Sequence, residues 1–343
     1  MVDLRGCKCR CRNWMVGLNV ANSYSNISSI DRDPKEIPVI CLMGPTATGK
    51  TDAAAQLYEA FPCEIISVDS SLVYTGMDIG TAKPDKNFLE KYPHHLVDIR
   101  HPNDTYSVAD FYQDAADLIE KCVNQGKVPV LAGGTMFYYN VLERGISDLP
   151  KANQALRKKI SLQAQEEGWP ALHAQLAKLD PLRAKKIECN DAQRIQRSLE
   201  IVLETSKTVA QQNIKAKPPI ANPILKVALT FSDRKYLHQR IEQRFDIMLE
   251  LGLQNEIEQL LAQGVNRDST AMKMIGYRQM LEFLDDDITY QTMRDKGVAA
   301  TRQLAKRQLT WLRNQRNVLW WVDFGLKEKD FSKLVEYVVQ FSN

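Results

Sequence analysis

The sequence predicts an α/β fold, in which a parallel sheet carries helices on both faces and a helical subdomain is inserted into the chain. Short apolar runs alternate with helical patterns over residues 37–142, as they do in parallel α/β sheets. Strand signals vanish over residues 143–218, where the sequence is charged and helical. A strand-like run returns at 224–231, so we expect residues 219–343 to complete the core with basic C-terminal helices.

The first strand is predicted over the apolar run 37–43, and the segment GPTATGKT follows it at once. This segment fits the P-loop pattern G-x-x-x-x-G-K-[ST], and a helical pattern begins directly after it. Its glycines let backbone N–H groups turn toward phosphate oxygens, Lys50 adds a positive charge, and the hydroxyl of Thr51 can bind Mg²⁺. We therefore expect an oligophosphate ligand and a magnesium cofactor. The candidate phosphate-binding residues are Gly44, Thr46, Ala47, Thr48, Gly49, Lys50 and Thr51, and Thr51 is the candidate metal ligand.

Two further strands are predicted to end beside this loop. The run 64–68 ends at Asp69, and the run 128–132 leads into Gly-Gly followed by Thr135. Because the carboxyl ends of parallel strands share one edge of the sheet, Asp69 should face the phosphate as a metal ligand or general base. A turn or capping role for Asp69 is the alternative. The acid that ATPases and GTPases carry at the end of a metal-binding strand is not evident after 128–132.

Helix boundaries are marked by local signals. Ser107 is the predicted N-cap of a helix that ends before Gly126, and Asp180-Pro181 marks a helix start inside the insertion. A last strand is expected over 318–324, after a long helical region that begins at 233.

The bulk composition is that of an ordinary globular protein. The 343 residues are 44% hydrophobic and 25% charged, with a net charge of +3. No apolar stretch reaches the roughly 18 residues that a membrane span needs, so no membrane partner is expected. Cys7, Cys9 and Cys11 lack zinc-site spacing, and residues 1–36, without a secretory signal, are predicted to be a disordered extension.

Several longer strings carry a resemblance to a known family. They are DSSLVYTGMDIGTAKP at 69–84, HHLVD at 94–98, PVLAGGTMFYY at 129–139, IGYRQM at 275–280 and ATRQLAKRQLTWLR at 300–313. Together with GPTATGKT, in this order and spacing, they resemble the bacterial tRNA dimethylallyltransferase (isopentenyl-tRNA transferase) family from about residue 37 to about residue 325.

The resemblance implies a nucleotide-kinase-like P-loop core with an inserted helical tRNA-binding subdomain. It implies transfer of a dimethylallyl group from dimethylallyl diphosphate to N6 of adenine 37 in the anticodon loop of tRNAs that read codons beginning with U. The P-loop would then hold the diphosphate leaving group. A monomeric cytoplasmic enzyme is expected, with the tRNA anticodon stem-loop as its partner.

The resemblance also implies residue roles. Asp69 would be the general base, Thr135 would orient the amine or the diphosphate, and Arg234 would reach the diphosphate, with a solvated surface charge as the alternative for Arg234. The residues implied to contact tRNA are Asp69, Ser70, Ser71, Leu72, Thr135, Arg157, Gln193, Arg194, Ile195, Gln196, Arg197, Lys273, Met274, Ile275, Gly276, Tyr277, Arg278, Arg302, Lys306 and Arg313.

Residues 294–316 contain seven basic residues and one acidic residue. The basic residues that share one side of a helix here, within an arc of about 80°, are Arg302, Lys306, Arg313 and Arg316. Leu304 and Trp311 fall roughly opposite, so we expect an apolar packing face and a basic face suited to phosphates. A solvated helix face is the alternative.

Three other functions remain open at the level of sequence. They are a P-loop small-molecule kinase, a prenyltransferase that acts on free adenine nucleotides, and a non-catalytic tRNA-binding protein. The helical insertion and the basic C-terminal region, which a mononucleotide would not require, favour tRNA over a free nucleotide.

Overall fold

The computed structural model describes residues 33–323 except 148, 151 and 212–215, together with 333 and 336. Cys7, Cys9 and Cys11 and most of the predicted extension lie outside these residues. The chain divides into two compact units, one made of residues up to 140 and from 221 onward, and one made of 141–220. The predicted limits of the insertion, 143 and 218, fall within the second unit.

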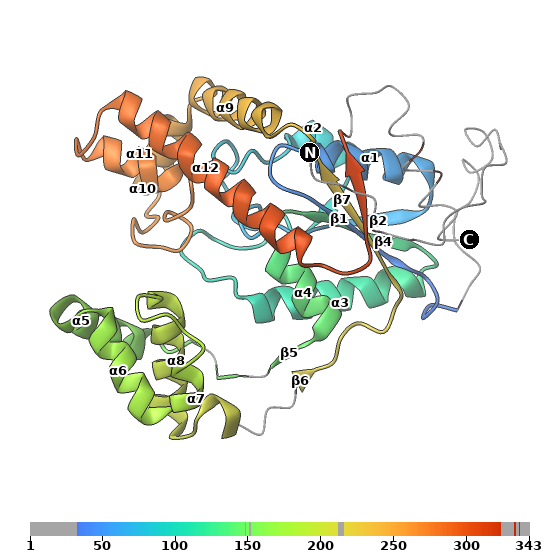
Figure 1. The fold of residues 1–343 in the computed structure, drawn as a ribbon. Helices are drawn as coiled ribbons and strands as arrows, with labels where there is room; N and C mark the ends of the chain where they lie inside the picture. Colours follow the sequence, from blue (N-terminus) through green and yellow to red (C-terminus); the bar gives the residue numbers. More distant parts are fainter. Residues whose placement is uncertain are drawn as a thin grey trace. The chain divides into compact units, whose positions relative to one another are not determined.

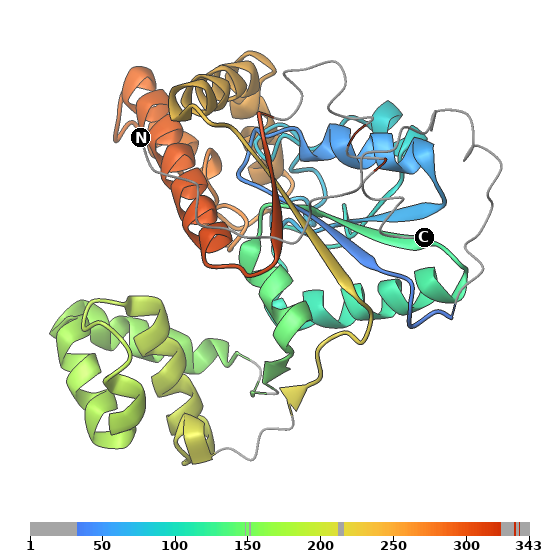
Figure 2. The ribbon, with the colours of Figure 1, turned by 45° about the vertical axis from the view of Figure 1, so that its right-hand side comes forward.

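The first unit is built on a parallel sheet with the strand order β3-β2-β4-β1-β7-β8 (Figure 1). Its strands are β1 (Val39–Met43), β2 (Cys63–Ser67), β3 (His94–His95), β4 (Val128–Gly133), β7 (Ile224–Thr230) and β8 (Val318–Val322). Helix α1 (Lys50–Ala60) covers one face and α3 (Val108–Asn124) covers the other, as Figure 2 also shows. Because β1 and β4 are covered on both faces, they are continuous buried apolar runs rather than alternating ones.

The predicted strands and helix ends correspond closely to the observed ones. Each of the five predicted strands is present within two residues of its predicted limits. Ser107 forms a capping box with Asp110 at the start of α3, and Gly126 follows the helix with a left-handed φ of 68°. Pro181 begins α7 (Pro181–Ala184). The two-residue strand β3 was not predicted, because it is too short to show a periodic pattern.

The C-terminal helices of the first unit form a second core. They are α9 (Arg234–Glu250), α10 (Leu253–Ala262), α11 (Tyr277–Leu284) and α12 (Tyr290–Arg313), which lie together in Figures 1 and 2. Tyr74 and Met77, from the segment after β2, are buried in this core. Helix α2 (Lys86–Lys91) follows that segment in the chain. The segment 69–84 therefore connects the sheet to the C-terminal helices.

The second unit is helical and has its own core. Its elements are β5 (Ile146–Ser147), α5 (Gln154–Glu167), α6 (Trp169–Leu179), α7, α8 (Ala192–Thr205), the 3₁₀ turn Val209–Gln211 and β6 (Ala216–Lys217), and α4 (Met136–Arg144) precedes them. Leu172, Leu176 and Leu199 lie at the centre of the core. No helix within the described ranges is both long enough and apolar enough to cross a membrane.

Candidate functional site

The loop between β1 and α1 has the curled backbone that phosphate binding requires. Ala47 and Gly49 adopt left-handed conformations with φ of 65° and 81°. The Thr48 hydroxyl and the Lys50 ammonium both donate to the carbonyl oxygen of Pro45, at 2.9 and 2.7 Å. The loop is thus wrapped around one of its own carbonyl groups and leads into the N-terminus of α1, where backbone N–H groups favour an anion.

A glutamine from the far end of the chain fastens this loop. The buried Gln308 side chain of α12 accepts a hydrogen bond from the Thr46 N–H at 3.0 Å and donates one to the Gly134 carbonyl oxygen at 2.8 Å. Gly44 is required because a Cβ there would lie 2.5 Å from the carbonyl oxygen of Leu229 in β7. Gln308 was not among the predicted site residues, although it lies in the RQLAKRQ string.

Asp69 follows β2 and is held by its own turn. Its Oδ1 accepts hydrogen bonds from the Ser71 N–H at 2.9 Å and from the Ser71 hydroxyl at 2.5 Å. The Thr135 hydroxyl accepts from the Ser70 N–H at 3.1 Å, which ties the end of β4 to the same turn. No described residue bonds to Oδ2 of Asp69. One carboxylate oxygen therefore stabilises the turn, as the alternative interpretation expected, and the other is available for chemistry.

The phosphate loop and this turn line one cavity of about 750 Å³ in the first unit. The opposite side is formed by α9, the segment 273–278 and α12. The predicted site residues that line it are Thr46, Lys50, Thr51, Asp69, Ser70, Ser71, Leu72, Thr135, Lys273, Met274, Ile275, Tyr277 and Arg278. Gly44, Ala47, Thr48 and Gly49 shape the loop behind them.

The cavity concentrates positive charge next to the phosphate loop. Burial lowers the pKa of Lys50 to about 7; the positive charge of Arg244 acts in the same direction and Asp69 acts against it. Burial likewise lowers the pKa of Arg244, whose guanidinium donates to the Thr81 carbonyl oxygen at 3.3 Å. An anion bound between these two cations would relieve both effects.

The prediction that Arg234 reaches this site is wrong. Arg234 is the first residue of α9, next to its N-cap Asp233, and it is exposed outside the cavity. The residues of α9 that line the cavity recur every three or four positions and are Ile241, Arg244, Phe245 and Met248. Arg244 is thus the cation that α9 supplies, and Arg240 donates to the Ala47 carbonyl oxygen of the phosphate loop at 2.9 Å. Helical spacing alone does not indicate which arginine faces the sheet.

The predicted faces of α12 are also revised. Leu304 and Trp311 line the cavity instead of packing, and Arg307 is the basic residue beside them. The predicted basic face lies about 180° away around the helix. On that face Lys306 and Arg313 are exposed, whereas Arg302 forms an ion pair with Glu242 at 2.8 Å. The buried residues of α12 are instead Met293, Gly297, Val298, Ala305, Gln308 and Leu312.

In the second unit, the predicted tRNA contacts differ in accessibility. Ile195 is fully buried in the helical core, so the prediction that it contacts tRNA is wrong. Arg157 and Arg197 both pair with the buried Glu200 carboxylate, at 3.1 and 3.0 Å, which gives them a structural role. The Gln196 amide donates to the Arg157 carbonyl oxygen and to Ser161. Gln193 and Arg194 are exposed.

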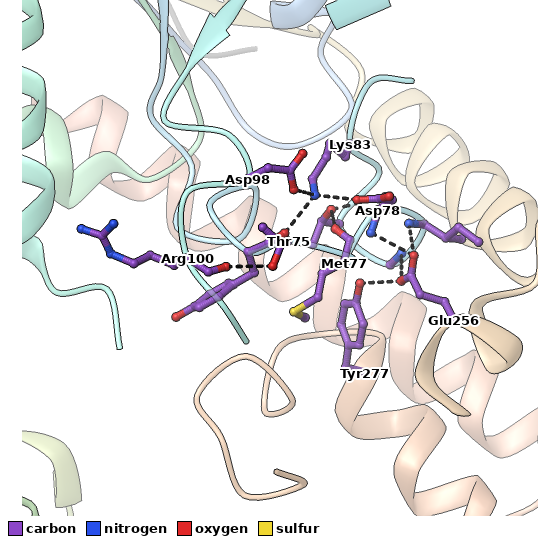
Figure 3. A network of polar contacts seen from close by, with 12 residues as sticks. Thr75, Met77, Asp78, Lys83, Asp98, Arg100, Glu256 and Tyr277 are labelled. Carbon is purple, nitrogen blue, oxygen red and sulfur yellow. Dashed lines mark hydrogen bonds and ion pairs between the residues drawn. The ribbon is translucent and has the colours of Figure 1, made fainter. Parts of the chain in front are cut away.

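The string DIGTAKP, residues 78–84, is held by a network around Glu256 of α10 (Figure 3). The Glu256 carboxylate accepts hydrogen bonds from three successive backbone N–H groups, those of residues 78–80, and from the Tyr277 hydroxyl at 2.6 Å. Lys83 forms ion pairs with Asp78 and Asp98 in the same network. The loop is therefore held from both ends.

Two predicted tRNA contacts lie here: Tyr277 is part of this network, and Gly276 precedes it in the chain. Tyr277 is fully buried, and a Cβ on Gly80 would lie 2.5 Å from its ring, so its hydroxyl and ring are both engaged within the protein. Gly276 has a φ of 91° and donates its N–H to the Gln279 side chain at 2.8 Å, outside the cavity lining. The prediction that these two residues contact tRNA is therefore wrong; they position the cavity wall.

Comparisons with known proteins agree with this architecture. The model of the IPP transferase family matches residues 72–315. A tRNA dimethylallyltransferase from Thiobacillus denitrificans is 53% identical over 279 residues, which cover 81% of this chain and 89% of the relative.

Among solved structures, the full-length tRNA isopentenylpyrophosphate transferase from Bacillus halodurans is 33% identical, with a TM-score of 0.65, and covers 90% of this chain and 97% of its own. A eukaryotic dimethylallyltransferase acting on tRNA is 26% identical, with a TM-score of 0.72, over 88% of this chain and 78% of its own.

Proposed function

The chain belongs to the IPP transferase family, and from this premise we propose that its phosphate loop holds the diphosphate of dimethylallyl diphosphate during prenyl transfer to tRNA. The enzyme transfers a dimethylallyl group to tRNA. The acceptor in this proposal is N6 of adenine 37, in tRNAs that read codons beginning with U. The observation that carries the proposal is one cavity that joins the phosphate loop, two cations and the Asp69 carboxylate.

The phosphate end of the cavity suits a departing diphosphate. Lys50 at the start of α1 and Arg244 of α9 line the same cavity and repel each other electrostatically, and the backbone N–H groups at the start of α1 add further positive potential. As the bond between the prenyl carbon and the diphosphate oxygen breaks, negative charge grows on that oxygen. Preorganised donors stabilise such charge without reorganisation at the moment of reaction.

Asp69 is the base in this proposal. The exocyclic amine of adenine is a weak nucleophile, so it must lose a proton as its nitrogen bonds to the prenyl carbon. Ser71 holds Oδ1 of Asp69, and Oδ2 accepts the proton. The Thr135 hydroxyl, which is tied to the Ser70 N–H, keeps the turn in place beside the reacting groups. The products are the prenylated base, diphosphate and a proton on Asp69.

The residues present fit a magnesium ion. Mg²⁺ is usually held by one or two protein oxygens together with substrate phosphates and water, rather than by a cage of protein ligands. Thr51, in the first turn of α1, lines the cavity, and its hydroxyl group would hold the ion. When bound, the ion would neutralise charge on the diphosphate.

The tRNA contacts in this proposal are those predicted residues that remain accessible. They are Asp69, Ser70, Ser71, Leu72, Thr135, Lys273, Met274, Ile275 and Arg278 in the cavity, and Gln193, Arg194, Lys306 and Arg313 on exposed surfaces. The proposal includes a monomeric enzyme in the cytoplasm.

The test is an acceptor competition with purified protein. Labelled dimethylallyl diphosphate is incubated with tRNA, with AMP or with ATP, and the label on each acceptor is counted. We expect label on tRNA only, at an adenine that nuclease digestion places beside the anticodon. Label on free nucleotides, or phosphorylation of a metabolite by ATP without prenyl transfer, would contradict the proposal.

A further inference from the structure

Two large aromatic side chains line the cavity and yet remain exposed. Phe137 is 48% exposed and Trp311 is 41% exposed. Their ring centroids are 6.2 Å apart, with an angle of 61° between the ring planes. An edge-on contact covers at most one face of one ring, so aromatic surface stays open on both. Exposed apolar surface in a cavity costs hydrophobic free energy and is typical of a ligand contact.

The two rings are held at defined places beside the reacting groups. Phe137 lies in the first turn of α4, two residues after Thr135. Trp311 lies in the last turn of α12, three residues after Gln308, whose side chain is bonded to the phosphate loop. Arg307 precedes Trp311 by one helical turn and lines the same cavity. An aromatic surface with a neighbouring arginine is thus directed at the site.

We propose that Phe137 and Trp311 form a stacking platform for a nucleobase of the tRNA. The proposal rests on the proposed function, since it requires tRNA in this cavity. Single-stranded loop bases of RNA are recognised by stacking on aromatic side chains, with arginine on the adjacent phosphate. The prenyl group of the donor is a small apolar chain, which a buried apolar surface would suit better than two rings that are nearly half exposed.

The first experiment measures tRNA and donor kinetics for three variants of Trp311. Stacking is worth about 1–3 kcal/mol per base, so Trp311→Ala should lower kcat/KM for tRNA about 5- to 150-fold, mainly through KM. The KM for dimethylallyl diphosphate should stay the same. Trp311→Phe should restore most of the loss, and Trp311→Leu, which is apolar but not aromatic, should not.

The molecule offers a matched control on the same helix. Tyr290 is an aromatic residue at the start of α12, 48% exposed, in edge-on contact with Phe283, and it does not line the cavity. Tyr290→Ala should leave the KM for tRNA unchanged. Thermal unfolding of all variants separates a stacking loss from a loss of folding, and the Phe and Leu variants still decide the matter if the Ala variant is unstable.

A second measurement identifies the base. Anticodon stem-loops that lack one loop base at a time are assayed with the native protein and with Trp311→Ala. At one position, loss of the base should abolish the difference between the two proteins.

Full rescue by leucine, a raised donor KM instead of a raised tRNA KM, or an unchanged Trp311→Ala variant would overturn the platform. These outcomes leave the proposed function intact, provided that the native protein prenylates tRNA. A native protein that does not prenylate tRNA defeats the proposed function itself.

Discussion

The phosphate loop and the network around Glu256 treat buried charge in opposite ways. At the phosphate loop, Lys50 lies beside another cation, Arg244, and burial lowers the pKa of the lysine to about 7. In the network of α10, the Glu256 carboxylate is surrounded by donors, three backbone N–H groups and the Tyr277 hydroxyl. The first arrangement leaves charge to be balanced by a ligand, and the second balances it within the protein. The difference distinguishes residues that bind a ligand from residues that hold the protein's own backbone in position.

The largest expected effect comes from the reacting carboxylate. Asp69→Asn keeps an oxygen for Ser71 but removes the base, so the single-turnover rate of prenylation should fall about 10²–10⁴-fold. The affinity for tRNA and the midpoint of thermal unfolding should stay the same. A loss below tenfold would show that Asp69 is not the base.

Removing the balanced charge should cost stability rather than chemistry. Glu256→Ala leaves three backbone N–H groups and the buried Tyr277 hydroxyl without their acceptor, so the free energy of unfolding should fall by about 3–5 kcal/mol in urea titrations. Glu258→Ala changes an exposed glutamate on the same helix and should stay within about 0.5 kcal/mol of the native protein. Equal stability of the two variants would contradict the positioning role.

Removing the charge of Lys50, which no described residue balances fully, should weaken ligand binding rather than lower stability. Lys50→Met should weaken dimethylallyl diphosphate binding about 10- to 100-fold, because a hydrogen bond to a charged group is lost, and leave tRNA affinity nearly unchanged. Isothermal titration with each ligand tests this. Equal weakening of both ligands would contradict the assignment of Lys50 to the diphosphate.

The same variant makes a pH prediction. The folded protein holds the Lys50 proton with a pKa of about 7, against an ordinary value of 10.5. Between these values the unfolded chain binds more protons, so this lysine's destabilising effect is complete below pH 7 and disappears as the pH rises toward 10.5. Lys50→Met should therefore raise the unfolding temperature most below pH 7, and the gain should shrink at higher pH. A gain in unfolding temperature that is independent of pH would mean that the charge of Lys50 does not destabilise the folded protein.

The smallest expected effect concerns the Tyr277 hydroxyl. Burial and the Glu256 carboxylate raise the pKa of Tyr277, so the phenol keeps its proton and donates. Tyr277→Phe removes this one donor and leaves the three N–H groups in place, so it should cost about 1 kcal/mol of stability. A cost as large as that of Glu256→Ala would show that the hydroxyl, rather than the backbone, holds the carboxylate.

Local patterns explain which features of the fold could be predicted. The phosphate loop, the strands and the Ser107 cap depend on residues within a few positions of each other. Asp69 and Thr135 could be placed in one site because parallel strands end at a common edge. The loss of strand signals over 143–218 indicated the insertion, and the family resemblance supplied the acceptor. The role of Arg234 rested on the resemblance and on its place after the strand at 224–231, and neither indicates which arginine of the following helix faces the cavity. The apolar packing face of α12 was predicted wrongly because helical periodicity assigns residues to faces without indicating which face meets the cavity.

The amino-acid sequence by itself determined the strand–loop–helix that grips a phosphate and the order of elements around it, because these follow from short-range sterics and hydrophobic periodicity. Only the tertiary structure decided that Arg244 and not Arg234 joins Lys50. It also decided that Gln308 fastens the phosphate loop and that Glu256 holds residues 78–80. Those contacts span 262 positions for Gln308 and Thr46 and 178 for Glu256 and Asp78, and such pairs are set by how whole helices pack.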